Sequence, residues 1–324
     1  MKSPAFWQTP GSPLGWLLAP LGRVYTGVTA WRLARSQPWK APVPVICVGN
    51  LSAGGTGKTP IVRDLATRLK ARGYRPGILS RGYGGAERGP LEVEPGKHSA
   101  AQVGDEPLLL ARDVECWIAA DRVAGARAMV DKGIDFVIMD DGLQNPSLAQ
   151  DLRLLTVDGA IGFGNGHGIP AGPLRESISA GLARTDAVIV LGKDERRLIE
   201  HYSGRSNMLQ ASVVLEGASW LVQRRVVGFA GLGRPDKFRV SLEEAGANVL
   251  GFHAFADHHP YTDDDLRDLM ARSETLNAEL VTTEKDWVRL GDKWRRYIKA
   301  IAIGIVWQDE AAIESLIDRL SRNA

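Results

Sequence analysis

Short apolar runs rich in Val and Ile alternate with segments of helical character between residues 43 and 191. Strands alternating with helices are typical of a parallel sheet that helices cover on both faces, so the pattern predicts an α/β fold. The helices are expected at Pro60–Arg72 and Arg122–Lys132, each followed by a glycine that ends it. The strands are expected at Val43–Val48, Arg75–Leu79, Glu115–Ala119, Phe136–Asp140, Leu154–Val157 and Ala187–Leu191.

A second, smaller α/β unit is predicted after residue 225. Around Val213–Arg225 the residues alternate without a clear helix, which indicates a linker or a small β-ribbon. Strands are then expected at Val226–Ala230, Asn248–Phe252 and Glu279–Thr282, with helices near Pro235–Ala245 and Asp263–Ser273. The predicted organisation is an N-terminal segment at 1–40, a first domain at 41–212, a linker at 213–225 and a second domain at 226–324.

The first forty residues are basic and rich in tryptophan. They carry five cationic side chains and no acidic one, because the first acid in the chain is Asp64. Within them Leu14–Leu33 is apolar and amphipathic, but Pro20 and Arg23 interrupt it, which makes a poor membrane-spanning helix. Basic residues between aromatic and aliphatic ones suit a helix in a membrane interface. We predict that this segment associates with a membrane surface; a helix docked on the protein's own core is the alternative.

Composition narrows the class of protein. The 324 residues are 44% hydrophobic and 24% charged, as in an ordinary globular protein of about two domains. The 40 basic and 38 acidic residues leave a formal charge of +2, so no overall field favours nucleic acid and no such partner is expected. The two cysteines, Cys47 and Cys116, lie in apolar runs and form neither a disulfide scaffold nor a zinc site, which fits a reducing compartment.

The segment Ser52–Thr59 lies between a predicted strand and a predicted helix. It is nearly the phosphate-binding pattern G-x-x-x-x-G-K-[ST], with Ser52 in place of the first glycine. Glycines let backbone N–H groups turn toward phosphate oxygens, and the positive end of the helix points at the same anion. Lys58 is expected to reach the β- and γ-phosphates, and the Thr59 hydroxyl to bind Mg²⁺. The predicted loop residues are Ser52, Ala53, Gly54, Gly55, Thr56, Gly57, Lys58 and Thr59.

Three further segments carry acidic or histidine side chains. Asp140-Asp141 ends a predicted strand, where a carboxylate would lie beside the Mg²⁺ of a P-loop protein; a cap or turn is the alternative. Gly104–Pro107 contains two carboxylates before a leucine-rich helix, although helix capping explains one of them. Asp257–Tyr261 contains two histidines beside an aspartate, which suits proton transfer or a plain surface loop.

Eight segments, in order between residues 43 and 290, resemble one known family. They are Val48–Pro60, Ser80–Gly85, Gly104–Pro107, Asp140–Gln144, Gly162–Gly166, Pro170–Glu176, Phe255–Tyr261 and Thr282–Asp286. Together they are similar to the tetraacyldisaccharide 4′-kinases of lipid A biosynthesis, whose loop also departs from the pattern at the position of Ser52. The resemblance implies ATP-dependent phosphorylation of the 4′-hydroxyl of a tetraacyldisaccharide 1-phosphate. It also implies a peripheral enzyme on the cytoplasmic face of a Gram-negative inner membrane, with the active site between two α/β domains that a two-stranded linker joins.

The resemblance also implies roles for particular residues. Asp105 is similar to the family's general base, paired with His258. The candidates for the Mg²⁺ ligands, beside Thr59, are Glu106, Asp140, Asp141 and Glu176. Arg122 and Arg175 are expected to stabilise the transferring phosphoryl group, and Tyr83 and Gln144 to contact nucleotide or substrate. Lys285 lies in a family segment, but its role is left open.

Two other functions remain as alternatives. One is a different P-loop ATPase or GTPase switch, such as a metal-insertion chaperone, although the chain shows neither an Asn-Lys-x-Asp guanine reader nor spaced His or Cys ligands. The other is a membrane-docked nucleotide-binding scaffold without chemistry, which predicts that Asp105→Ala leaves function intact.

Overall fold

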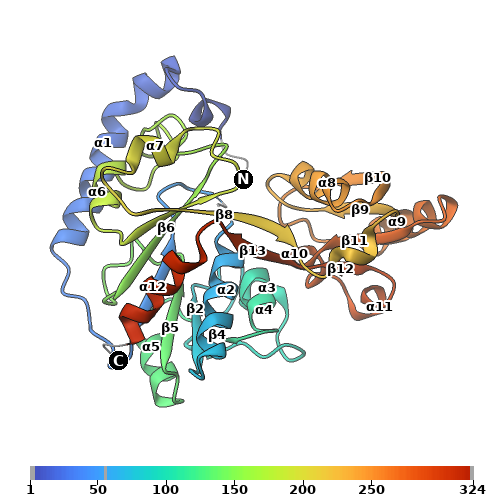
Figure 1. The fold of residues 1–324 in the computed structure, drawn as a ribbon, viewed down its shortest axis with the longest axis horizontal. Coiled ribbons are helices and arrows are strands. Elements are labelled where there is room, and N and C mark those ends of the chain that lie inside the picture. Colours follow the sequence, from blue (N-terminus) through green and yellow to red (C-terminus); the bar gives the residue numbers. More distant parts are fainter. Residues whose placement is uncertain (1–3, 55–56, 322–324) are drawn as a thin grey trace.

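Two β-sheets of unequal size organise the chain (Figure 1). The structure is a computed structural model that describes residues 4–54 and 57–321. Within them the larger sheet has nine strands in the order β13-β8-β7-β6-β1-β5-β2-β4-β3. These strands are β1 (Val45–Gly49), β2 (Pro76–Ser80), β3 (Leu91–Glu92), β4 (Glu115–Ile118), β5 (Phe136–Asp140), β6 (Leu152–Asp158), β7 (Ala187–Leu191), β8 (Met208–Leu215) and β13 (Ile303–Trp307).

The larger sheet is parallel except at its two edges, where β3 and β13 join antiparallel. β1 lies at its centre between β5 and β6, so that Val48 is in register with both Asp140 and Leu154. Because parallel strands end at the same edge of a sheet, the loops after β1, β2 and β5 gather there. The predicted α/β class with a parallel sheet is confirmed.

Alternate side chains of the central strands face two separate hydrophobic cores. Ile46 and Val48 of β1 pack with α2, α4 and α12, whereas Val45 and Cys47 pack on the opposite face with α5, α6 and α7. Burial on both faces explains the continuous apolar runs in the sequence. The helices of this body are α1 (Pro13–Ala34), α2 (Lys58–Ala71), α3 (Ala100–Val103), α4 (Asp105–Leu110), α5 (Arg122–Asp131), α6 (Ile178–Ala183), α7 (Leu198–Tyr202) and α12 (Glu310–Ser321), with the short 3₁₀ helix η1 at Ala5–Gln8.

The smaller sheet is parallel throughout, in the order β10-β9-β11-β12. Phe238 of α8 packs on one face, and Leu266 and Leu269 of α9 pack on the other. α10, which follows β11 directly, contacts α4 of the larger body. The elements are β9 (Arg225–Ala230), β10 (Asn248–Ala254), β11 (Glu279–Thr283), β12 (Lys299–Ile301), η2 (Ala218–Leu221), α8 (Pro235–Glu244), α9 (Asp263–Thr275), α10 (Glu284–Trp287) and α11 (Asp292–Arg295).

A two-stranded ribbon of β8 and β13 runs between the two bodies (Figure 1). Leu215 pairs with Ile303, and Ala211 with Trp307. The structure differs here from the predicted division of the chain, because β13 and α12, placed by the sequence in a second domain at 226–324, return to the larger body. Local alternation in a sequence does not reveal which sheet an edge strand will join, which is why the pattern missed this return.

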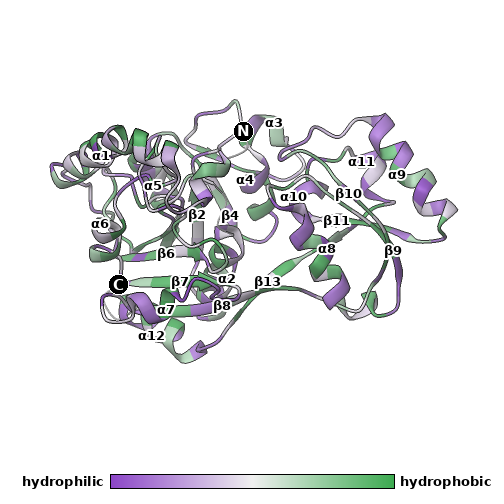
Figure 2. Cartoon of the chain, turned by 90° about the horizontal axis from the view of Figure 1, so that it is seen from above, coloured by the Kyte–Doolittle hydropathy of each residue, from purple (hydrophilic) through white to green (hydrophobic). Residues whose placement is uncertain are grey.

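The N-terminal helix α1 packs on the larger body through small residues. Its buried positions are Gly15, Ala19, Gly22 and Thr29, and a Cβ at Gly22 would stand 2.6 Å from the Gly168 carbonyl oxygen. The predicted helix is therefore present, but its large apolar residues face solvent. Figure 2 shows α1 at the margin of the molecule. The exposed side chains are Leu14, Trp16, Leu17, Leu21, Val24, Tyr25, Val28 and Trp31.

None of the helices in the described part of the chain combines the length and the hydrophobicity that crossing a membrane requires.

Candidate active site

The loop after β1 is the segment that the sequence predicts to bind phosphate. The N–H of Ala53 donates to the Pro173 carbonyl oxygen at 2.7 Å, which holds the loop against the long segment 159–175. Gly57 has a left-handed backbone (φ 77°) immediately before α2, a conformation that favours glycine. Gly55 and Thr56 lie outside the described residues. The described part has the strand, loop and helix in the order that a P-loop requires.

Lys58 and Thr59 occupy the first turn of α2. Lys58 Nζ lies 3.4 Å from Asn50 Oδ1 and 3.5 Å from Asp141 Oδ1, and only 12% of its side chain is exposed. The amine therefore sits between the loop and the end of β5, where the positive end of α2 also points. Thr59 is half-buried beside it. An anion placed here would meet a fixed cation, backbone N–H groups and a hydroxyl.

Asp140 and Asp141, adjacent at the end of β5, have opposite environments. Asp140 is 4% exposed, and its Oδ1 has no hydrogen-bond partner among the described residues. Burial, reinforced by the charge of Glu106, raises the pKa of Asp140 to about 7. Burial also acts on Asp141, but Lys58 and Arg175 outweigh it and lower its pKa; Arg175 Nη1 donates to Asp141 Oδ2 at 2.9 Å. A buried carboxylate oxygen without a donor is suited to bind a cation.

Asp105 begins α4 and accepts hydrogen bonds from the smaller body of the molecule. Arg289 donates to Asp105 Oδ2 through Nε at 3.0 Å and Nη2 at 2.7 Å, and His258 Nδ1 lies 3.1 Å from the same oxygen. Burial would raise the pKa of Asp105, but the His258 hydrogen bond and the charges of Lys285 and Arg289 hold it well below its usual range. The helix cap is Gly104, so Asp105 does not serve as the N-cap that the sequence left open. The structure thus brings Asp105 and His258 together from different bodies.

Lys285, whose role the sequence left open, crosses between the two bodies beside Asp105. Its Nζ lies 3.0 Å from Glu106 Oε1 and 3.9 Å from Asp105 Oδ2. Burial would lower the pKa of Lys285, but the charges of Glu106 and Asp105 outweigh it and raise the pKa, so the amine is a cation. Glu106, a predicted magnesium ligand, is held by this amine in the conformation described.

The sequence did not identify Arg289 as a residue of the site, nor Asp286 as its partner. Arg289 has 8% of its side chain exposed, and Asp286, fully buried, accepts from Arg289 Nη1 at 3.0 Å. The only signal available was the family-like segment Thr282–Asp286, which contains one of the two residues. Nothing in the sequence relates Arg289 to Asp105, because they meet only when the two sheets are packed together.

Gln144 and Glu176 meet beside the P-loop. Gln144 Nε2 donates to the Asn50 carbonyl oxygen at 3.0 Å and to Glu176 Oε1 at 2.7 Å. Both carboxylate oxygens of Glu176 also accept from Arg184, and the residue is 1% exposed. Glu176, another predicted magnesium ligand, would have to leave these donors before it could bind a cation.

Arg122 and Tyr83 lie near the ends of β2 and β4. Arg122 is buried, and its Nη1 donates to the carbonyl oxygens of Ser80 (3.1 Å) and Ala119. These hydrogen bonds connect the ends of the two strands. Burial lowers the pKa of its guanidinium. Tyr83, by contrast, is 78% exposed and open to a ligand.

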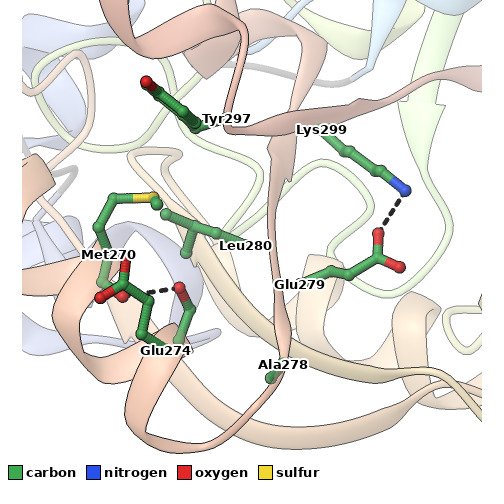
Figure 3. Close-up of a pocket in the computed structure, with 8 residues that line it drawn as sticks. Met270, Glu274, Ala278, Glu279, Leu280, Tyr297 and Lys299 are labelled. Carbon is green, nitrogen blue, oxygen red and sulfur yellow. Dashed lines mark hydrogen bonds and ion pairs between the residues drawn. The ribbon is translucent and has the colours of Figure 1, made fainter.

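A cavity of about 340 Å³ lies away from this site, in the smaller body (Figure 3). No residue named above for the site lines it. Its lining consists of Met270, Ser273, Glu274, Ala278, Glu279, Leu280, Tyr297 and Lys299. In the described part of the chain, no group of three or more His, Cys, Asp or Glu side chains could hold a metal ion by itself.

Comparisons with known proteins agree with one another. The family profile described as Tetraacyldisaccharide-1-P 4′-kinase matches residues 14–322. The chain is 49% identical over 323 residues to a tetraacyldisaccharide 4′-kinase of Rhodospirillum centenum, covering 98% of this chain and 96% of the relative. It is 48% identical to the enzyme of that name from Gluconacetobacter diazotrophicus, with 98% of each covered. The crystal structure of LpxK from Aquifex aeolicus in complex with ATP matches with a TM-score of 0.77 and 30% identity, over 95% of this chain and 99% of that one.

Proposed function

The chain belongs to the tetraacyldisaccharide-1-P 4′-kinase family, and from this premise we propose how its residues transfer a phosphoryl group. It is a tetraacyldisaccharide 4′-kinase, an enzyme that phosphorylates the 4′-hydroxyl of a tetraacyldisaccharide 1-phosphate at the expense of ATP. The observation that carries the proposed mechanism is the 3.1 Å contact between Asp105 and His258. No observation favours the alternative of a nucleotide switch.

ATP is proposed to bind with its phosphates on the loop before α2. The Aquifex relative was crystallised with ATP, and this chain has the fixed amine, the hydroxyl and the helix end that a polyphosphate needs. Lys58 would then exchange its contact with Asp141 for the β- and γ-phosphates. Arg175, on the other side of Asp141, lies where it could neutralise charge on the transferring group.

The oxygen atoms of Asp140, Asp141 and Thr59 suit the binding of a magnesium ion. Asp140 has a buried oxygen that no described residue satisfies, Asp141 lies next to it, and Thr59 supplies a hydroxyl. Mg²⁺ is typically held by one or two carboxylates with substrate phosphates and water, so a cage of three protein carboxylates is not needed. Asp140, Asp141 and Thr59 would hold the ion, which would supply positive charge to offset the negative charge of the phosphates.

Asp105 and His258 are proposed to act together as the base. The imidazole donates from Nδ1 to the carboxylate, and its Nε2 lies 3.8 Å from Asp257 Oδ1, beyond hydrogen-bond distance. His258 has 42% of its side chain exposed and Asp105 only 7%, so His258 is the accessible member of the pair. As the 4′-oxygen bonds to the γ-phosphorus and the bond to the β-phosphate oxygen breaks, the hydroxyl proton passes to the imidazole and ADP leaves. A positioned base contributes about 10²- to 10⁴-fold.

We also propose that the exposed side of α1 binds the membrane that holds the four-chain substrate. Large apolar side chains line this side, and Arg23, Arg32 and Arg35 lie on or next to the helix, where anionic headgroups would attract them. The proposal places the enzyme at the cytoplasmic face of the inner membrane, where ATP is available. The free, buried Cys47 and Cys116 suit that reducing compartment.

Vesicle binding tests the role of α1. Leu17→Glu/Val24→Glu should reduce co-sedimentation with anionic phospholipid vesicles at least about 10-fold, because two charges would enter the bilayer interface. Val222→Glu/Val240→Glu, which changes exposed valines of the smaller body, is the matched control. Equal binding by all three proteins would contradict the proposal.

Phosphate transfer tests the reaction itself. The assay follows label from γ-labelled ATP into tetraacyldisaccharide 1-phosphate in mixed micelles, with wild type beside Lys58→Ala. We expect labelled lipid from the wild type and a loss of at least about 100-fold in the variant. ATP hydrolysis without labelled lipid would contradict the kinase and favour the switch.

A further inference from the structure

Arg289 lies between a carboxylate of each body, at the point where the proposed base is assembled. We propose that Arg289 is a positioning residue for phosphoryl transfer: anchored on Asp286, it fixes the Asp105 carboxylate against His258. The inference rests on the proposed function and deepens it, because it names what aligns the base.

The first observation is the grip on Asp105. Two nitrogens of Arg289 donate to the same Oδ2 that faces His258 Nδ1. The backbone N–H of Glu106 donates to Oδ1 at 3.0 Å, so both oxygens of Asp105 have fixed donors. A carboxylate held in this way has one orientation, and the imidazole that donates to it is oriented in turn.

The second observation is the anchor behind Arg289. Asp286 Oδ1 accepts from Arg289 Nη1, from the Tyr261 hydroxyl at 2.8 Å and from the Gly231 N–H at 3.0 Å. Its Oδ2 accepts from the Thr283 hydroxyl at 2.7 Å. Four donors on a fully buried carboxylate make a rigid anchor.

The third observation links Arg289 to the other half of the base. Arg289 Nη1 also donates to the Gly231 carbonyl oxygen at 3.3 Å, and the same oxygen accepts from the His258 N–H at 3.2 Å. His258 has a left-handed backbone (φ 59°), so its loop depends on such contacts to keep its conformation. One guanidinium therefore contacts the Asp105 carboxylate directly, and it shares the Gly231 carbonyl oxygen with the backbone N–H of His258.

An arginine at position 289 is suited to positioning Asp105. A guanidinium is planar and presents donors on three nitrogens, so it can grip two carboxylates on different sides. An ammonium at the same place would supply the charge but could not span Asp105 and Asp286 in fixed geometry. An ion pair that only held the two bodies together would not require a second hydrogen bond to the carbonyl oxygen that also accepts from the His258 N–H.

The experiment separates positioning from stability and from the proposed function. Transfer to lipid is measured for wild type, Arg289→Ala, Arg289→Lys and Arg267→Ala, with the melting temperature and the KM for ATP of each. Arg267 is the matched control, because it pairs with Asp264 on the surface of the smaller body, away from the site. Absence of transfer by the wild type would refute the kinase; every other outcome concerns Arg289.

We expect Arg289→Ala to lose about 100-fold in kcat with the KM for ATP within about 3-fold, because a misplaced catalytic group costs this much. Arg289→Lys should lose at least about 10-fold although it folds and keeps the charge. Added guanidinium ion at millimolar, non-denaturing concentration should restore part of the kcat of Arg289→Ala and none of that of Asp105→Ala. Wild-type kcat in a folded Arg289→Lys, or equal response of both alanine variants to guanidinium, would overturn the inference.

Discussion

Asp105 and Asp140 are two buried carboxylates at the same edge of the larger sheet, and their surroundings differ completely. Asp105 has cations and an imidazole around it, and its pKa is held well below the usual range in spite of burial. Asp140 has an oxygen without a donor among the described residues, and burial raises its pKa to about 7. Carboxylates whose environments push their pKa values apart commonly have different roles. Here Asp105 is fixed in charge and position, whereas Asp140 has an oxygen that no described residue donates to and that is free to bind a cation.

The largest expected effect concerns activity at the fixed carboxylate. Asp105→Asn should reduce kcat about 10³-fold, because a neutral amide neither orients the imidazole nor stabilises the charge it acquires. ATP affinity, measured by calorimetry, should stay within about 3-fold, since Asp105 is proposed to act on the acceptor side. Near-normal kcat in a folded Asp105→Asn protein would support the scaffold alternative.

Stability should change in opposite directions at the two sites. Asp105→Asn leaves Nε and Nη2 of the buried Arg289 without a carboxylate partner, and should lower the free energy of unfolding by about 3 kcal/mol at pH 8. At the same pH the buried Asp140 is ionised, which destabilises the folded protein. Asp140→Asn removes this charge and should raise the free energy of unfolding by about 1–2 kcal/mol. The difference follows from the directions of the two pKa shifts. The pKa of Asp140 is raised in the folded state, so its contribution to stability is lost as the pH increases from about 4 to 7. The pKa of Asp105 is lowered, so its contribution is fully present above about pH 4.

Urea unfolding at pH 5 and pH 8 measures both effects. The advantage of Asp140→Asn over the wild type should shrink at pH 5, where the buried carboxyl is protonated. A destabilised Asp140→Asn protein at pH 8 would mean that Asp140 has a partner that this account lacks.

Magnesium binding should depend on pH at the open carboxylate. A cation must displace the proton of Asp140, so affinity should rise about 10-fold between pH 6 and pH 8 if the pKa is near 7. Titration of Mg²⁺ in the presence of ATP, followed by transfer rate, gives the midpoint at each pH. Asp140→Asn should abolish the dependence; the same slope in both proteins would assign it to another group.

Glu106 gives the smallest effect and connects the two regions. Its charge helps to raise the pKa of Asp140. Glu106→Gln should therefore move the midpoint of the magnesium pH profile down by about half a unit, with little change in maximal affinity. An upward shift would show that the glutamate itself binds the cation.

The sequence predicted the parts of the site that local chemistry defines. The P-loop and Asp140-Asp141 followed from a strand–loop–helix pattern, and the gathering of their loops followed from the parallel sheet. The pairing of Asp105 with His258 came from the resemblance to a family, since their segments alone suggested a cap and a surface loop. Their contact in the structure agrees with that pairing, while its catalytic role stays a prediction.

What the sequence did not reveal depends on packing between distant segments. Arg289 and Arg184 are ordinary arginines in the sequence, and only the assembled fold shows that one grips Asp105 and the other Glu176. The return of β13 to the larger sheet has no local signal either. For α1, periodicity could not tell which side would be buried, because small residues proved to be the packing side.

The measurement that tests the central claim most directly is a double-mutant cycle on kcat for lipid phosphorylation. It compares Asp105→Ala, His258→Ala and the double variant with the wild type. If the two residues act as one base, the double variant should be no more than about 3-fold slower than the slower single variant. If the losses of the two single variants multiply in the double variant, the residues act independently and the claim is wrong.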